Sequence, residues 1–254
     1  MINQRPPVEA KISVDHKFFS IIEDAYRVFA YPKPTSTDVC ERCCLDARIA
    51  SDFFVPPIRE LPLRYVQNWF DAAYSGEGVT RETWGYLLPR ILEILASGED
   101  ASVTSFEISL KRFDTGSPKK WSSGEWAILD RFQREFLRYK IESGNDALDD
   151  VICMFRLAGW PLEDLLDQVA LTPDATLAQR LWHDWCRGCV PGREGVWITT
   201  FWESPDNTTV FDFYTSHELY AKMEALALAD DTEAELAARA SAVASVIEAS
   251  APST

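Results

Sequence analysis

The chain has 254 residues, of which 46% are hydrophobic, with nine Trp and fourteen Phe, so it can bury one large core or two small ones. Its 40 acidic and 25 basic residues give a net charge of −15, and a surface this negative repels nucleic-acid phosphates and anionic lipid. No apolar run approaches the length of about 18 residues that spans a membrane, and no secretory signal is visible, so we expect a cytoplasmic protein.

The negative charge is unevenly distributed along the chain. Residues 1–141 carry 20 acids and 19 bases, whereas residues 142–254 carry 20 acids and only 6 bases. An acidic surface steers a basic partner towards it, although the same charge also serves simply to keep a protein in solution. The second half is therefore the expected docking region, with solubility as the alternative explanation.

Apolar residues at helical spacing predict most of the chain to be α-helical. Thr80, Ser216 and either Ser122 or Ser123 precede such segments as N-cap residues, and Asp38 is expected to cap a short helix or knuckle that carries the first cysteines. Residues 102–113 alternate like a strand, but we favour a helix there. The helices are expected over residues 14–30, 61–73, 80–98, 122–144, 147–158, 162–170, 173–185, 216–226 and 233–249, with Pro89 kinking or starting the third.

One segment has the composition of β-structure. Residues 196–202 and 208–214 are rich in aromatic and β-branched side chains and flank a polar segment at 203–207, which predicts an antiparallel β-hairpin. Since an isolated hairpin is marginal in water, it must pack on the helices or pair with another strand. The expected fold is therefore a single, mainly α-helical domain over 1–254, with a small hairpin near 196–214 and a frayed tail at 250–254.

The sequence contains two Cys-x-x-Cys pairs, Cys40/Cys43 and Cys186/Cys189, and this spacing is common among metal ligands. If folding brings them together, their four thiolates can hold a structural zinc, and Cys44 or His183 can replace one of them. Buried free thiols and a redox pair are the alternatives, because cysteine is also a common core residue. Cys153 lies on an apolar helical face and is expected in the core.

The sequence offers little for catalysis. It contains three histidines and none of the common nucleophile, phosphate-binding, metalloprotease or dinucleotide motifs. The pair Asp149-Asp150 and the acidic face formed by Glu163, Asp164 and Asp167 are typical of a solvated helix surface, with a metal site or an acid–base pair as the alternative. We therefore expect a protein that is not an enzyme, with no cofactor, and zinc as the alternative.

Aromatic residues gather in the acidic half, where Tyr and Trp rings with carboxylates around them suit recognition of a basic protein. The alternative is that the same rings form the core. The residues expected to bind a partner are Glu163, Asp164, Asp167, Asp184, Trp202, Asp206, Asp212 and Tyr214.

Four segments carry a resemblance to other proteins: the run Cys40-Glu41-Arg42-Cys43-Cys44, then 62–64, 86–93 and 182–186. Together they resemble an uncharacterised family of bacterial cytosolic proteins, with no activity to transfer. Some members of such families are immunity proteins, so the resemblance implies a toxin-like partner. We expect a non-catalytic, acidic protein-interaction module, most concretely an immunity-type inhibitor of a basic toxin or nucleic-acid-directed enzyme. The first alternative is a zinc-containing protein or a metal- or thiol-dependent enzyme that uses the two Cys-x-x-Cys pairs. The second is a scaffold or regulatory subunit, and the oligomeric state stays open.

Overall fold

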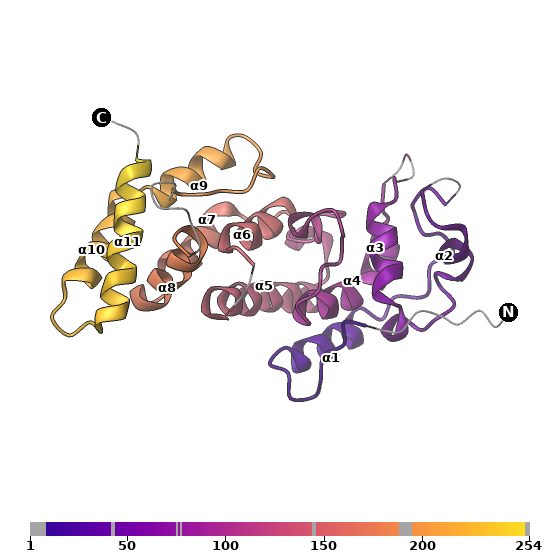
Figure 1. Cartoon of the computed structure of the whole chain (residues 1–254). Coiled ribbons are helices and arrows are strands. Elements are labelled where there is room, and N and C mark those ends of the chain that lie inside the picture. Colours follow the sequence, from indigo (N-terminus) through magenta and orange to yellow (C-terminus); the bar gives the residue numbers. More distant parts are fainter. Residues whose placement is uncertain are drawn as a thin grey trace. The chain divides into compact units, whose positions relative to one another are not determined.

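A computed structural model describes residues 9–41, 44–74, 76, 78–143, 146–187 and 195–251. These residues are mainly α-helical, with eleven α-helices and three short 3-10 helices among them (Figure 1). The chain divides by its contacts into two compact units: unit 1 is Met1–Gln133 with Leu157–Gly159, and unit 2 is Arg134–Arg156 with Trp160–Thr254. No helix in the described part of the chain is both long and apolar enough to cross a membrane. That 1–254 behaves as a single domain stays a prediction.

Unit 1 is built around the helices that the apolar periodicity predicts. Its elements are α1 (Phe19–Val28), α2 (Ala47–Asp52), η1 (Ile58–Glu60), α3 (Leu63–Asp71), α4 (Arg81–Ala96), η2 (Phe106–Ile108), η3 (Pro118–Lys120) and the first part of α5 (Ser123–Ser143). The helices predicted over 14–30, 61–73 and 80–98 are thus confirmed as α1, α3 and α4. Residues 102–113 are mostly turns with one 3-10 turn, so the favoured α-helix there is wrong.

The helix α4 forms the centre of unit 1, and nearly all of its side chains are buried. Thr80 caps it as predicted, since its hydroxyl accepts from the backbone N–H of Thr83 at 3.2 Å. Trp84 lies 6.0 Å from Trp69 between ring centroids, and its indole N–H donates to Thr115 Oγ1 at 3.0 Å. Pro89 lies inside the helix and does not start it.

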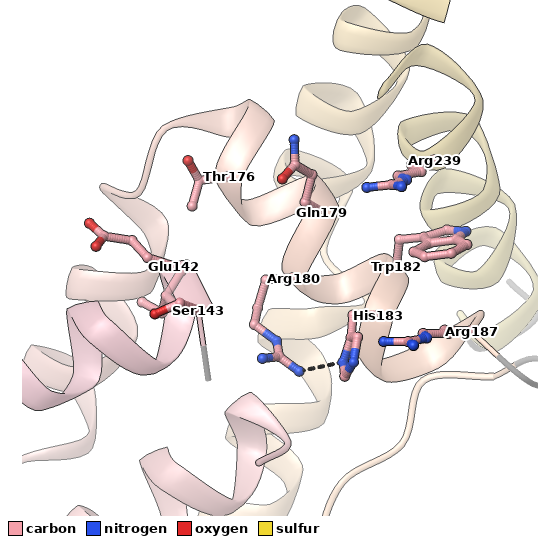
Figure 2. Close-up of a pocket in the computed structure, with 10 residues that line it drawn as sticks. Glu142, Ser143, Thr176, Gln179, Arg180, Trp182, His183, Arg187 and Arg239 are labelled. Atoms are coloured by element: carbon pink, nitrogen blue, oxygen red, sulfur yellow. Dashed lines mark hydrogen bonds between the residues drawn. The ribbon is translucent and has the colours of Figure 1, made fainter. Parts of the chain in front are cut away.

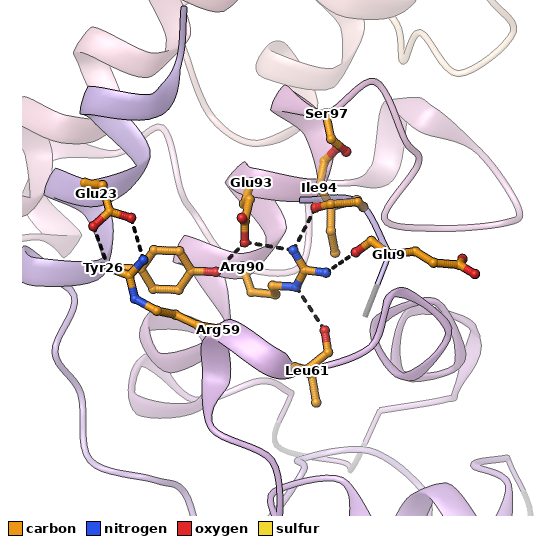
Figure 3. A network of polar contacts seen from close by, with 10 residues as sticks. Glu9, Glu23, Tyr26, Arg59, Leu61, Arg90, Glu93, Ile94 and Ser97 are labelled. Carbon is orange, nitrogen blue, oxygen red and sulfur yellow. Dashed lines mark hydrogen bonds and ion pairs between the residues drawn. The ribbon is translucent and has the colours of Figure 1, made fainter. Parts of the chain in front are cut away.

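A fully buried arginine on α4 ties several elements of unit 1 together (Figure 3). Arg90 Nε donates to the carbonyl of Leu61 at 2.9 Å, and Nη1 donates to the carbonyl of Ala10 and to Glu93 Oε2, both at 2.8 Å. The hydroxyl of Tyr26, on α1, donates to the same Glu93 oxygen at 2.7 Å. A buried charge must be paired and hydrogen-bonded, and here both members of the ion pair are.

The segment before the first cysteines differs from the prediction. Asp38 has φ 58° and caps no helix of its own; its carboxylate accepts from the backbone N–H of Thr80 at 2.9 Å and from its hydroxyl at 2.6 Å. The short helix that follows, α2, is instead capped by Asp46, which accepts from the N–H of Arg48 at 2.8 Å. Asp38 therefore connects this loop to the start of α4.

Unit 2 contains the end of α5 and six further helices, which run from the pink through the orange to the yellow part of the chain in Figure 1. They are α6 (Leu148–Leu157), α7 (Leu162–Ala170), α8 (Asp174–Trp185), α9 (Asp206–Tyr214), α10 (His217–Leu228) and α11 (Ala234–Ser250). All but α9 are predicted by the apolar periodicity. The core of this unit includes α6, where Ile152, Cys153 and Phe155 are completely buried.

The last two helices form an α-helical hairpin that packs on α8 (Figure 1). Ser216 caps α10 as predicted, because its hydroxyl accepts from the backbone N–H of Leu219 at 3.2 Å. The alanine-rich helix α11 buries Ala240, Val243 and Ile247. It reaches Ser250, and residues 252–254 of the predicted tail lie outside the described residues.

The predicted β-hairpin near 196–214 is wrong. Residues 206–214 form α9, and the described residues contain no strand, only an isolated bridge between Val39 and Tyr74. Val210 and Tyr214 are buried and four residues apart, so a helix places both on one face. A strand would place Asp212 on that face too, but Asp212 is exposed. The residues that precede α9 bind side chains instead of a strand partner: the N–H of Thr199 donates to Asp149 Oδ2 at 2.6 Å.

Candidate functional site: the acidic surface of unit 2

The helix α7 separates apolar and acidic residues on opposite faces. Leu162, Leu165 and Val169 are buried at i, i+3 and i+7, which is the helical repeat of a core-facing side. Glu163, Asp164 and Asp167 are exposed, and no ion pair joins any of the three to a basic residue in the part of the chain that the structure describes. The outward face of α7 is therefore negatively charged.

Unit 2 exposes a further carboxylate and two large aromatic rings. The helix α9 packs against α7 and exposes Asp212. In the segment that leads into α9, Trp197 and Phe201 keep 48% and 38% of their surface exposed, which is unusual for such large apolar side chains. We call Glu163, Asp164, Asp167 and Asp212 the acidic surface.

The two aromatic residues expected to anchor a partner lie in the core. Trp202 is 8% exposed and donates from Nε1 to Asp149 Oδ2 at 2.9 Å; Tyr214 is 1% exposed and packs edge-on against Trp185, 5.2 Å between ring centroids. Burial, with the nearby carboxylates of Asp149 and Asp184, raises the pKa of Tyr214 well above its usual value. In this conformation neither ring is presented to a partner, which corrects the expectation.

Two of the expected acidic contacts are used inside unit 2. Asp184 forms a buried ion pair with Arg180 and also accepts from the backbone N–H of Leu148 at 3.0 Å. Asp206 pairs with Arg156 Nε at 2.5 Å. Both carboxylates already connect elements of unit 2, so the predicted partner contacts that stay exposed are the four residues of the acidic surface.

The structure describes only part of the proposed zinc ligand set. Cys40 and Cys186 are half-buried and belong to different units, and Cys43 and Cys189 lie outside the described residues. Within the described residues, no three His, Cys, Asp or Glu side chains are grouped to hold a metal ion. The zinc site stays a prediction.

The remaining cysteines and the alternative ligand His183 are found in different surroundings. Cys44 is exposed, and Cys153 is completely buried in the core of unit 2, as its apolar helical face indicates. His183 Nδ1 lies 2.8 Å from Arg180 Nη2. Because a guanidinium can only donate, Nδ1 of His183 accepts this hydrogen bond, and its lone pair is not free to bind a metal ion.

The sequence analysis predicted an exposed, partner-binding ring at Trp202, but the exposed ring is that of its neighbour Phe201. Phe201 is exposed and Trp202 is buried, and the only sequence signal is helical or strand periodicity, which is absent from this irregular segment. Trp197 also lies among the aromatic residues of the acidic half, but no sequence pattern marks it as exposed. The carboxylates of α7 could be found because their helix has a regular period.

No protein-family model, curated protein or solved structure matches the chain. The resemblance to an uncharacterised bacterial family therefore stays a prediction, and the function has to be argued from the geometry of this chain itself.

Proposed function

We propose that the protein is a non-catalytic docking protein that binds a basic protein partner through the acidic surface of unit 2. The observation that carries the proposal is the set of three exposed carboxylates on one face of α7, which have no counter-ion among the described residues. An immunity-type inhibitor of a basic toxin or nucleic-acid-directed enzyme is the concrete form of such a protein.

Charge and exposed rings have separate roles in this proposal. Carboxylates at a surface mainly raise the association rate with a basic partner, and salt screens their effect. Exposed aromatic rings bury apolar area at the interface and slow dissociation. Phe201 and Trp197, in the segment that leads into α9, provide such rings in unit 2.

The test compares two triple variants with equal charge changes. The first, Glu163→Gln with Asp164→Asn and Asp167→Asn, neutralises the α7 part of the acidic surface. The control, Asp230→Asn with Asp231→Asn and Glu233→Gln, neutralises three exposed acids in the turn between α10 and α11. Partners are captured from the producing cells with wild-type protein, identified by mass spectrometry, and their association rates are then measured at several salt concentrations.

We expect the α7 variant to lower the association rate about tenfold at low salt and to flatten its dependence on ionic strength. The control variant should stay close to the wild type. The proposal fails if the captured partner is acidic, or if the α7 variant associates as fast as the control at every salt concentration.

A further inference from the structure

Unit 2 contains a cavity of about 510 Å³ between the end of α5, the helix α8 and a side chain of α11 (Figure 2). Its volume is within the range of about 300–1,000 Å³ that is usual for small-molecule sites. Glu142 comes from α5, Trp182 and His183 from α8, and Arg239 from α11. All of these elements belong to unit 2.

The cavity concentrates positive charge in an acidic part of the chain. Residues 142–254 contain 6 basic residues, and three of them, Arg180, Arg187 and Arg239, line this cavity. Guanidinium groups present planar sets of donors that match a carboxylate. One wall of the cavity is therefore built for an anionic group.

Two of the three arginines are held by partners within unit 2. Arg180 is paired with Asp184, and its Nη2 lies 2.8 Å from His183 Nδ1. Arg239 is paired with Glu235, and its guanidinium lies 4.7 Å from the ring centroid of Trp182. The charges of Arg180 and Arg239 are thus balanced, and both side chains are fixed in position before any ligand arrives.

Arg187 differs from the other two. It is exposed, follows the end of α8, and forms no ion pair with any residue in the described ranges. Its backbone N–H donates to the carbonyl of Trp182 at 3.0 Å, which holds the residue at the edge of the cavity. Among the described residues, Arg187 is therefore the arginine of this cavity without a paired carboxylate, and it lies next to His183 in Figure 2.

The other side of the cavity is negative. Glu142 is exposed in the last turn of α5 and lies across from Arg187 and His183 (Figure 2). The carbonyl groups at the end of a helix carry partial negative charge and favour a cation there. Glu142 and the end of α5 together suit an ammonium group.

We propose that this cavity binds a small zwitterion of the amino-acid class, a free amino acid or a dipeptide. Its carboxylate binds on the side of Arg187 and His183, and its ammonium group binds on the side of Glu142. A multiply charged phosphate ester is disfavoured, because Arg180 and Arg239 are already paired with Asp184 and Glu235, and Glu142 lines the cavity as well, within a strongly acidic unit. The site is separate from the acidic surface of the proposed function.

The test titrates the whole protein by calorimetry with free L-amino acids and glycyl dipeptides at millimolar concentration. Each is compared with its N-acetyl derivative, which lacks the ammonium group, and its amide, which lacks the carboxylate. Adenosine monophosphate and inorganic phosphate serve as control anions that carry no ammonium group. Variants Arg187→Gln and Glu142→Gln alter exposed side chains, and Arg134→Gln and Glu248→Gln make the same changes at exposed positions of unit 2 that do not line the cavity.

We expect at least one zwitterion to bind about tenfold more tightly than either derivative. Arg187→Gln should abolish the preference over the amide, Glu142→Gln the preference over the N-acetyl compound, and the two control variants should keep both preferences. The proposal is overturned if no free amino acid or dipeptide binds, if the phosphates bind more tightly, or if the cavity variants discriminate as the wild type does.

Discussion

At the residue scale, Arg90 shows how unit 1 accommodates a charge in its core. The side chain is completely buried, and its guanidinium donates to backbone carbonyls before and after α1 as well as to Glu93. A buried pair of this kind adds little net stability over an apolar pair, but loss of one member leaves the other charged and unpaired. The arginine is therefore expected to be essential for the fold of unit 1.

We predict that Arg90→Met lowers the free energy of unfolding by about 3–5 kcal/mol, because it leaves the carboxylate of Glu93 buried without its counter-ion. Urea unfolding followed by circular dichroism measures the change. The control is Arg27→Met, which removes an exposed ion pair with Asp24 and should cost less than about 1 kcal/mol.

The same experiment separates charge from shape. Replacing both partners, Arg90→Met with Glu93→Leu, removes the unpaired charge and should recover part of the lost stability. If the double variant is as unstable as the sum of the two single variants, then the network stabilises unit 1 through its contacts with backbone carbonyls and not through the ion pair.

The sequence could assign the acidic side chains of α7 to the surface, but it could not tell which of the rings of Phe201 and Trp202 is exposed. The acids of α7 could be assigned to the surface, since Leu162, Leu165 and Val169 fix which side of that helix is buried. Trp202 and Phe201 are neighbours in an irregular segment, and their exposures depend on the hydrogen bond from Trp202 to Asp149, 53 residues away in the chain. No local pattern contains that information.

At the scale of elements, the helices with a regular apolar period were predictable and α9 was not. Its sequence, Asp206-Asn207-Thr208-Thr209-Val210-Phe211-Asp212-Phe213-Tyr214, is rich in residues that favour strands. Such propensities are weak, and tertiary packing overrides them when a helix buries the right pair, here Val210 and Tyr214. The prediction that Asp38 caps a short helix was wrong for a similar reason, because its carboxylate binds Thr80, 42 residues further along the chain.

Substitution of Thr209 distinguishes helix from strand at α9. The residue is exposed in the helix, so we predict that Thr209→Ala raises the free energy of unfolding by a few tenths of a kcal/mol, and that Thr209→Gly lowers it by a similar amount. In a strand the order changes, because Thr is favoured there over both Ala and Gly. Thermal unfolding of the three proteins gives the order directly.

Thr200 provides the control for this series, since it is exposed in the turn before α9 and outside any helix. Alanine at that position should bring no gain. A wild-type protein that is more stable than both Thr209 variants would show that residues 206–214 are extended in solution, and the predicted hairpin would then be restored.

At the scale of the whole molecule, negative charge dominates. The chain carries 40 acidic and 25 basic residues, and most of the excess lies in residues 142–254. Within unit 2 the described bases are largely engaged: Arg156 pairs with Asp206, Arg180 with Asp184 and Arg239 with Glu235. Few described bases are left to neutralise the exposed acids, such as those of the acidic surface. These acids therefore repel one another in the folded protein.

We predict that sodium chloride raises the melting temperature between about 10 mM and about 150 mM, because screening over a Debye length of about 8–10 Å weakens repulsion among exposed acids. Buried pairs such as Arg90 with Glu93 are screened far less and should contribute little to the change. Differential scanning calorimetry measures the effect. The variant Asp230→Lys with Asp231→Lys makes the net charge less negative at exposed positions, so its melting temperature should rise less with salt than that of the wild type. A melting temperature that falls as salt is added would mean that attractive surface pairs outweigh the repulsion, and that the acidic surface is balanced within the chain instead of being available to a basic partner.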